Sequence, residues 1–361
     1  MSRELPSMAT PVGIALIGTG HIGQKAHLPA FQKMQEEGKV RLVAICDVDE
    51  DALQTAAAKF QVVQTFTDYR KMLELGEIDA VDVCTPNYLH KQPVIDSFAA
   101  GKHVICEKPL AINAIEGAEM VAAGHAAGKQ FQVALNMRFG AGPQAVKRFI
   151  DDGKLGEIYY ARAHALRRRG IPGWGLFTQK DKQGGGPLID IGVHILDLTL
   201  WLMGYPEPVS TTGQTYAKFG HREGVLGLMG QWDPKTFTVE DFAAGFIRFA
   251  NGATLSLESS FAANIAENQF HTSIFGTEGG AYLEPNQEAN TRIFREESGA
   301  LTDTTPVFLS KIGTHEAELR AFVQAIADDT PVPVPGEQGL MVTRILDALY
   351  QSAETGREVL M

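Results

Sequence analysis

The chain has 361 residues, of which 44% are hydrophobic and 21% are charged, and its formal net charge is −11. This length favours two domains over a single core, and the composition is typical of a soluble globular protein. An acidic surface repels phosphate backbones, so we expect no nucleic-acid partner. We also expect no membrane segment, because no apolar run approaches the ~20 residues that a spanning helix needs.

Residues 1–11 lack the apolar core of a secretory signal and predict a short disordered tail. The three cysteines, Cys46, Cys84 and Cys106, fall at or near the ends of predicted buried strands. A thiol in such a place behaves as a small apolar group. The odd number and wide spacing argue against a disulfide framework and a structural zinc site, and they favour a cytoplasmic protein.

The run from Val12 to Gly23, VGIALIGTGHIG, predicts a buried strand, a glycine-rich turn and the start of a helix. Gly18, Gly20 and Gly23 have the G-x-G-x-x-G spacing of a dinucleotide-binding turn. Gly18 permits the tight turn, Gly20 lets the backbone approach a pyrophosphate, and Gly23 lets the helix pack on the strand. The helix N-terminus then offers free N–H groups to the anion.

A second apolar run, Val40–Cys46, ends at Asp47. A carboxylate at this place can accept hydrogen bonds from the ribose hydroxyls of the adenosine half and repels a 2′-phosphate. We therefore expect NAD to be preferred over NADP. The alternative is that Asp47 only caps the helix that begins near Asp49.

Residues 12–136 alternate apolar strands with helices such as Ala114–Ala127, which predicts an α/β Rossmann domain with a parallel, doubly wound sheet. Residues 137–361 contain longer β-rich runs, Val225–Gln231 among them, and predict an α+β domain with a large, mostly antiparallel open sheet. We expect this second domain to bind substrate and to form oligomers. Its last helix, Glu337–Thr355, could pack back on the first domain.

Three predicted strand ends in the first domain carry polar side chains, and such ends are where α/β sheets bind ligands. They are Thr85-Pro86-Asn87 with His90, Glu107-Lys108, and Asn136-Met137-Arg138. The ammonium of Lys108 can hydrogen-bond a substrate hydroxyl and favour its alkoxide character. The alternative is a surface pair between Lys108 and Glu107.

Three glycines, Gly184–Gly186, lead into a predicted helix over Asp190–Met203, in which Asp190 and His194 share one face. An imidazole beside a carboxylate suits a general base near neutral pH. Two alternatives stay open: a capping Asp190 with a core His194, and a metal site that uses both. A zinc alcohol site needs a third protein ligand, and none is evident, so we expect no metal.

Together these motifs resemble the glucose–fructose oxidoreductase / inositol dehydrogenase (Gfo/Idh/MocA) family over nearly the whole chain. The resemblance implies NAD(P)-dependent oxidation of a hydroxyl on a cyclic polyol or sugar. It implies that Lys108 holds the substrate oxygen, that His194 is the general base, and that Asp190 binds substrate and tunes its neighbours. It also implies a homodimer or homotetramer through the open sheet.

The residues expected to bind the cofactor are Gly18, Gly20, His21, Ile22, Gly23, Asp47, Thr85, Pro86, Asn87, His90, Glu107, Lys108 and Asn136. Those expected to bind substrate are Lys108, Arg138, Arg168, Trp174, Asp190, His194 and His315. The segment 167–174 could instead be a solvated basic loop or an oligomer contact. Two other functions stay open, a redox-neutral glycoside hydrolase that uses NAD and a non-catalytic dinucleotide and sugar sensor.

Overall fold

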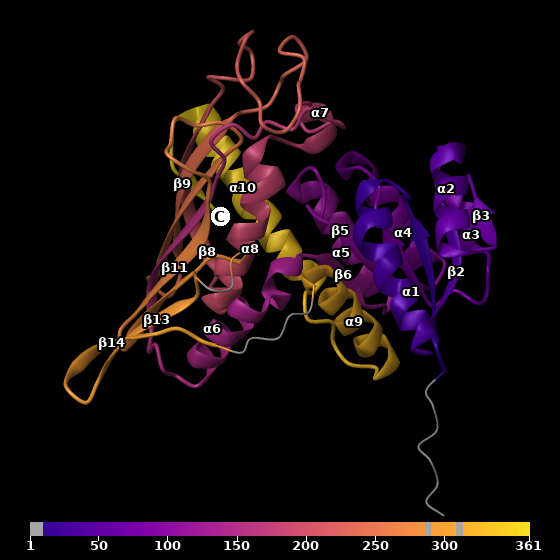
Figure 1. Ribbon diagram of the computed structural model, residues 1–361, viewed down its shortest axis with the longest axis horizontal. Helices are drawn as coiled ribbons and strands as arrows, with labels where there is room; N and C mark the ends of the chain where they lie inside the picture. Colours follow the sequence, from indigo (N-terminus) through magenta and orange to yellow (C-terminus); the bar gives the residue numbers. More distant parts are fainter. Residues whose placement is uncertain (1–9, 286, 288–289, 308–312) are drawn as a thin grey trace, which may run out of the picture.

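The computed structural model describes residues 10–285, 287, 290–307 and 313–361, so most of the predicted tail lies outside the described residues. Figure 1 shows two halves, each built around its own sheet, with helices between and around the sheets.

The first sheet has six strands in the order β3-β2-β1-β4-β5-β6, and all of its pairs are parallel. This is the doubly wound order, with its switch point between β1 and β4, and it confirms the predicted Rossmann sheet. The strands are β1 (Val12–Ile17), β2 (Val40–Cys46), β3 (Gln64–Phe66), β4 (Ala80–Val83), β5 (His103–Glu107) and β6 (Phe131–Ala134).

Helices cover both faces of this sheet, which is why β1 and β4 are buried along their whole length. The glycine turn is followed by a π-helical turn, η1 (Gly23–His27), before α1 begins. The remaining helices are α1 (Leu28–Glu36), α2 (Glu50–Phe60), α3 (Tyr69–Leu73), the 3₁₀ turn η2 (Asn87–Leu89), α4 (Lys91–Ala99) and α5 (Ala114–Ala127).

The second sheet has nine strands in the order β14-β13-β12-β11-β7-β10-β9-β8-β15. Only the β7–β10 pair is parallel among its recorded pairings, which confirms the predicted, mostly antiparallel open sheet. The strands are β7 (Ile158–Leu166), β8 (Pro208–Tyr216), β9 (Phe242–Phe249), β10 (Thr254–Ser260), β11 (Gln269–Gly276), β12 (Gly279–Leu283), β13 (Arg292–Glu297), β14 (Ala300–Thr304) and β15 (Val359–Leu360).

Helices lie on the face of this sheet that points toward the first half (Figure 1). They include η3 (Asn136–Phe139), α6 (Ala141–Asp151), the π-helical turn η4 (Leu188–Gly192), α8 (Val193–Leu202) and α10 (Gly336–Thr355). The short helix α7 (Lys180–Gln183) contacts η2, and α9 (Thr314–Ala327) packs against α1, β1 and β6 of the first half. The stretch Lys180–Leu202 is long and apolar enough to cross a membrane by composition. However, 83% of its apolar window is buried inside the protein, as in a core helix.

The predicted strand at Val225–Gln231 is wrong, because that run is a loop. Leu226 and Leu228 are 79% and 77% exposed, so they have no sheet face to pack on. The predicted helix over Asp190–Met203 also differs, since its first turns are the π-helical η4 and only Val193–Leu202 is α-helical.

The closing segment of the chain returns to the first half. Helix α10 packs against α5 and β6, where a Cβ on Gly339 would come within 2.6 Å of the Val133 side chain. The N–H of Val133 donates to the carbonyl of Val334 at 3.0 Å, and α9 contacts both η1 and η3. These contacts pack the two halves of the chain against each other.

Candidate active site

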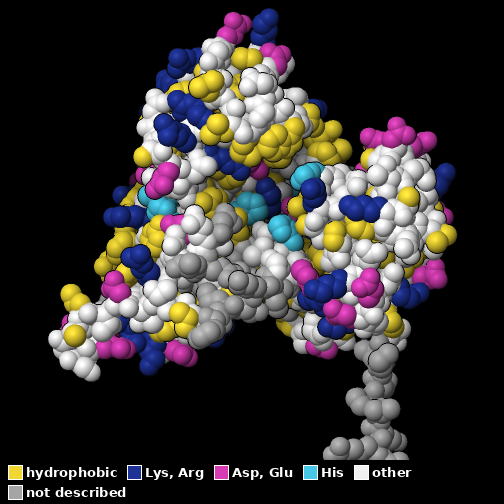
Figure 2. Space-filling model, in the orientation of Figure 1, with side chains coloured by type: hydrophobic (Ala, Val, Ile, Leu, Met, Phe, Trp, Pro, Cys, Tyr) yellow, Lys and Arg dark blue, Asp and Glu magenta, His cyan; other side chains and the backbone are white. Residues whose placement is uncertain are grey.

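Lys108 reaches across the crevice to the second half of the chain. It follows β5, and its Nζ lies 3.0 Å from the backbone oxygen of Asp190 and 3.1 Å from the carboxylate Oδ1 of the same residue. The side chains are 18% and 12% exposed, so the pair is largely shielded from solvent. Figure 2 shows the molecule hollowed between its halves, with several histidine side chains in the hollow. Lys108 is therefore not a surface partner of Glu107.

Two cations surround the Asp190 carboxylate. Lys108 contacts Oδ1, and Nη1 of Arg167 lies 3.9 Å from Oδ2. Burial alone would raise the pKa of Asp190, but the charges of Lys108 and Arg167 outweigh it and lower the pKa below its usual value. Asp190 is thus an ionised carboxylate at neutral pH. It lies inside η4 and makes no capping hydrogen bond there.

His194 lies one turn after Asp190, in the first turn of α8, and is half-buried near the same pair. Burial lowers the pKa of His194 to about 3, helped by the charge of Lys108 and opposed by that of Asp190. The ring is therefore neutral near pH 7. Among the residues that the structure describes, its Nδ1 has no hydrogen-bond partner. A buried, unpartnered nitrogen next to a lysine can accept a hydrogen bond from a ligand.

A buried glutamate anchors the turn that carries Asp190. Glu240 accepts hydrogen bonds from the N–H groups of Gly186 at 2.9 Å and Leu188 at 3.1 Å, and from the hydroxyl of Tyr350 at 2.8 Å. Position 185, just before Gly186, has no room for a side chain, because a Cβ on Gly185 would lie 2.0 Å from the Tyr350 hydroxyl oxygen. The glycine run therefore lets the turn approach its anchors.

The glycine turn after β1 has the form that dinucleotide binding requires. Gly18 has φ +101°, and a Cβ there would lie 2.6 Å from the backbone of Cys84. A Cβ on Gly23 would lie 2.6 Å from the Gly18 oxygen, so both positions exclude side chains. Nothing lies within 4 Å of the Cβ position of Gly20, which leaves space for a phosphate beside the backbone. His21 and Ile22 complete the turn.

Asp47 lies beside this turn at the end of β2. Its Oδ2 accepts hydrogen bonds from the backbone N–H of Thr19 at 2.6 Å and from the Thr19 hydroxyl at 3.1 Å. The cap of α2 is Asp49, which accepts from the N–H of Ala52 at 3.0 Å. The capping alternative for Asp47 is therefore wrong, and its carboxylate is held at the turn instead.

The loop after β4 carries three of the predicted cofactor residues. Thr85 has a buried hydroxyl with no partner among the described residues, and this hydroxyl can hydrogen-bond a polar ligand. The Asn87 amide donates to the Gln183 side-chain oxygen at 2.7 Å, across the crevice. His90 lies behind the loop, with its ring nitrogens 2.9 Å from the Pro109 oxygen and 2.8 Å from the Thr85 oxygen.

His315 lies near the Lys108 end of the crevice at the start of α9. The amide nitrogen of Asn136 lies 3.1 Å from its Nε2 and 2.8 Å from the hydroxyl of Thr314. Burial lowers the pKa of His315, opposed by the charge of Glu107. The structure thus brings Asn136 and His315 together on the side of the crevice formed by α9.

Arg138 is buried in the protein core and does not line a substrate site. Its guanidinium is 2% exposed, forms a two-pronged ion pair with Asp197, and also donates to Gln338 and Tyr205. Arg138 therefore cannot face a substrate, and the expectation for it is corrected. The strand end places its backbone near the crevice, but a buried carboxylate on α8 draws the side chain into the core.

Arg168 and Trp174 are exposed, and the arginine that reaches the site is Arg167. Arg168 donates to the carbonyl of Ala266 at 2.9 Å, and Trp174 is 52% exposed. The sequence contained a signal for Arg167, since the buried alanines of β7 occupy alternate odd positions from 161 to 165. Position 167 continues that alternation onto the inner face of the sheet.

Known proteins resemble the chain over nearly its whole length. Residues 12–135 match "Oxidoreductase family, NAD-binding Rossmann fold", and residues 147–361 match "Oxidoreductase family, C-terminal alpha/beta domain", both of the Gfo/Idh/MocA family. D-glucoside 3-dehydrogenase of Escherichia coli (strain K12) is 36% identical over 352 residues, covering 97% of this chain and 98% of that protein.

Two further relatives are more distant. Myo-inositol 2-dehydrogenase of Thermotoga maritima is 26% identical, covering 96% of this chain and 97% of the relative. The solved structure of levoglucosan dehydrogenase in complex with NADH and levoglucosan is 26% identical, with a TM-score of 0.84 and coverage of 97% and 99%. The match of both halves and the 36% identity over the full length show the family. The chain belongs to the Gfo/Idh/MocA family of oxidoreductases, as its sequence motifs predicted.

Proposed function

We propose that this protein is an NAD-dependent dehydrogenase that oxidises one hydroxyl of a sugar or cyclic polyol. The observation that carries the proposal is the contact of Lys108 with Asp190, with His194 beside it, at the carboxyl edge of a dinucleotide-binding sheet. The names of the glucoside, inositol and levoglucosan dehydrogenases support the substrate class.

The residues around the first sheet fit a nicotinamide dinucleotide. The turn from Gly18 to Gly23 would hold the pyrophosphate, and Asp47 would hold the adenosine ribose and disfavour a 2′-phosphate. The unpartnered hydroxyl of Thr85 and the neighbouring Pro86 and Asn87 would line the nicotinamide end. When bound, NAD supplies the acceptor for the hydride of the alcohol carbon. NAD is therefore proposed as the preferred cofactor over NADP.

Three residues would act on the alcohol. Lys108 would donate a hydrogen bond to the substrate oxygen and stabilise its developing negative charge. His194, neutral at physiological pH, would take the hydroxyl proton as the hydride leaves the same carbon. Asp190 would accept a hydrogen bond from a neighbouring hydroxyl while it holds the Lys108 ammonium in place. Sugars and cyclic polyols offer the adjacent hydroxyls that such a pair can bind.

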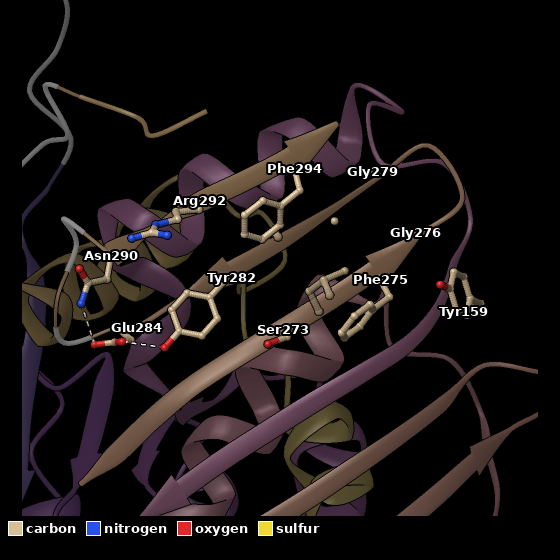
Figure 3. A pocket seen from close by; sticks show the side chains of 13 residues that line it. Tyr159, Ser273, Phe275, Gly276, Gly279, Tyr282, Glu284, Asn290, Arg292 and Phe294 are labelled. Atoms are coloured by element: carbon tan, nitrogen blue, oxygen red, sulfur yellow. Dashed lines mark hydrogen bonds between the residues drawn. The ribbon is translucent and has the colours of Figure 1, made fainter. Parts of the chain in front are cut away.

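We place the boundary between the cofactor-binding and substrate-binding parts at residues 136 and 137, and we propose a cytoplasmic protein. We also propose a homodimer or homotetramer through the open face of the second sheet. That face bears a groove of about 710 Å³ whose lining includes Tyr159, Phe275, Tyr282 and Phe294 (Figure 3). Aromatic side chains on a sheet face without helices favour burial against another subunit. Light scattering in solution tests the oligomeric state.

A panel of sugars, glucosides and inositols, each incubated with NAD and separately with NADP, tests the function. We expect NADH absorbance to rise with at least one member of the panel. Product formation without NADH would favour the redox-neutral hydrolase. Sugar and NAD binding with no product at all would favour the sensor.

A further inference from the structure

His27 lies in a buried contact chain that the mechanism above does not use. It is the last residue of the π-helical turn η1, and its ring is fully buried. Nδ1 lies 2.7 Å from Oδ2 of Asp82 on β4, and Nε2 lies 3.0 Å from Oε1 of Glu107 on β5. A neutral imidazole has one N–H, so the ring can donate to both carboxylates only as an imidazolium. This geometry assigns a positive charge to His27.

Glu107 contacts Lys108 as well as His27. Its second oxygen, Oε2, accepts the backbone N–H of Lys108 at 3.0 Å. Burial would raise the pKa of Glu107, but the hydrogen bond and charge of His27, together with Lys108, lower it to about 2. The carboxylate is therefore ionised and fixed at both oxygens. A continuous line of contacts joins His27, Glu107, Lys108 and Asp190.

The backbone at both ends of this line has the same unusual form. π-helical turns are rare and often mark functional sites. Within the described residues, η1 ends at His27 and η4 contains Asp190. The other titratable groups near the His27 ring are Cys84 just after β4, with Sγ 3.4 Å from Nδ1, and His315 on α9, with ring centroids 6.3 Å apart. Glu318, also on α9, is fully buried, and burial and the charge of Glu107 raise its pKa well above the usual value, opposed by the charge of His27.

We propose that His27 is a positioning residue for hydride transfer, which ties the helix of the glycine turn to Glu107 and so fixes the direction in which Lys108 enters the crevice. The proposal rests on the proposed function. It joins the cofactor-holding turn to the residue that holds the substrate oxygen. A small displacement of Lys108 would then change the rate of the chemical step more than it changes the binding of either ligand.

Loss of the imidazolium would leave Asp82 and Glu107 as two buried carboxylates close together. One of the two carboxyl groups would take up a proton, because two neighbouring carboxyl groups in a buried site do not both stay ionised. If Glu107 became protonated, the hold on the Lys108 backbone would weaken. The charge that Glu107 exerts on His194 would also be lost. Both effects act on catalysis and neither acts on the pyrophosphate turn itself.

The central experiment compares His27→Gln with a control histidine on β5, at the opposite end of that strand from Glu107. His103 begins β5, and its Nδ1 accepts the backbone N–H of Gln130 at 3.0 Å. We expect His27→Gln to lower kcat by about 10- to 100-fold, with KM for the sugar and Kd for NAD changed by less than about threefold. His103→Gln should leave kcat within about twofold. A folded His27→Gln enzyme with normal kcat would overturn the proposal.

A double-mutant cycle separates positioning from mere stabilisation. If His27 acts through Glu107, the double variant His27→Gln/Glu107→Gln should lose no more kcat than the worse single variant. Independent, additive losses would overturn the proposal. A lower melting temperature with unchanged kcat for the folded fraction would also overturn it, because it would show a purely structural role.

A third measurement needs neither substrate nor a stable variant. Histidine-selective NMR titration of the protein without NAD should find the His27 ring charged at pH 7, since Asp82 raises its pKa well above the usual value despite burial. A neutral ring would overturn the proposal. The atoms of His27, Asp82 and Cys84 that could bind a metal ion lie within 4.8 Å of one another. Stoichiometric metal in the purified protein would therefore also overturn the proposal, because a metal-bound imidazole is not an imidazolium. Failure of the sugar panel with a charged His27 would instead fault the proposed function.

Discussion

Lys108 and Asp190 are 82 residues apart in the chain, yet the ammonium contacts both the carboxylate and the backbone oxygen of its partner. One residue follows the fifth strand of the parallel sheet, and the other lies in a π-helical turn of the second half. The site therefore forms only when the two halves are packed together. Displacement of one half against the other would separate the groups that act on the substrate.

Asp47 should set the cofactor preference. A carboxylate close to a 2′-phosphate costs about 1–3 kcal/mol, so kcat/KM should be about ten- to two-hundredfold higher with NAD than with NADP. Asp47→Ala should narrow this ratio, mainly by weakening the use of NAD. Asp49→Ala, which removes only the helix cap, is the matched control and should keep the ratio. Equal kcat/KM values for both cofactors in the unmodified enzyme would contradict the assignment.

Lys108→Ala should abolish turnover while NAD still binds. The lysine contacts Asp190 and would act on the substrate oxygen, so we expect a loss of at least ~10²-fold in kcat/KM. Lys33→Ala breaks an exposed pair with Glu316 and should have little effect. Steady-state kinetics and NAD titration of the three proteins provide the check. Near-normal activity of Lys108→Ala would show that the crossing contact is only structural.

The pH–rate profile of the enzyme should show no acid limb from His194 near the usual histidine pKa. Its folded pKa is lowered to about 3 by burial, so the neutral base is already present well below neutral pH. We expect kcat/KM to change little on the acid side between about pH 8 and pH 5. His194→Asn should cost roughly 10²–10⁴-fold in rate. A clear acid limb near pH 6.5 that His194→Asn removes would contradict a His194 ring that is neutral in this range.

The same lowered pKa has a consequence for stability. The unfolded histidine binds its proton near pH 6.5, whereas the folded one does not until about pH 3. His194 therefore destabilises the folded protein as the pH falls below about 6.5, and His194→Asn should remove that contribution. Urea unfolding at about pH 7 and pH 5 measures this difference. An equal loss of stability in both proteins over that range would contradict the account.

Arg138 should matter for stability. Arg138→Ala leaves Asp197 buried without its partner, and such a loss typically costs about 3–5 kcal/mol of folding free energy. The melting temperature should fall, while KM measured at low temperature should change little. Arg168→Ala is the control, since it removes an exposed side chain. A raised KM for the sugar with unchanged stability would restore Arg138 to the substrate site.

Metal removal should have no effect on catalysis. A metal held by Asp190 and His194 would be incompatible with the Lys108 ammonium at 3.1 Å from the Asp190 carboxylate. Activity after exhaustive treatment with a chelator should equal that of the untreated enzyme. A loss of activity that added zinc restores would support the metal alternative instead.

The cofactor half of the fold was predictable because its signals are local. Gly18, Gly20 and Gly23 act within one turn, and the helix Ala114–Ala127 was predicted with the bounds that the structure has. Arg138 could not be placed in the same way. Its partner Asp197 is 59 residues away on another element, and nothing near Arg138 in the sequence indicates a buried carboxylate.

The other differences have the same origin in tertiary contacts. Val225–Gln231 has the composition of a strand, but its leucines face solvent, and none of the strands in the described part of the chain pairs with it. The pKa of His194 depends on the balance between burial and the charges of Lys108 and Asp190, which spacing alone cannot decide. Arg167 was distinguishable from Arg168 only through the alternation of β7, which a run of three arginines hides.

The most direct test is the stoichiometry of NADH against oxidised sugar, measured in the same reaction with the best substrate from the panel. Oxidation of one hydroxyl transfers one hydride, so the proposed dehydrogenase should form NADH and the keto product in equal amounts. The Lys108→Ala and His194→Asn variants should form neither. A sugar product that accumulates while NAD stays oxidised would contradict the proposed function.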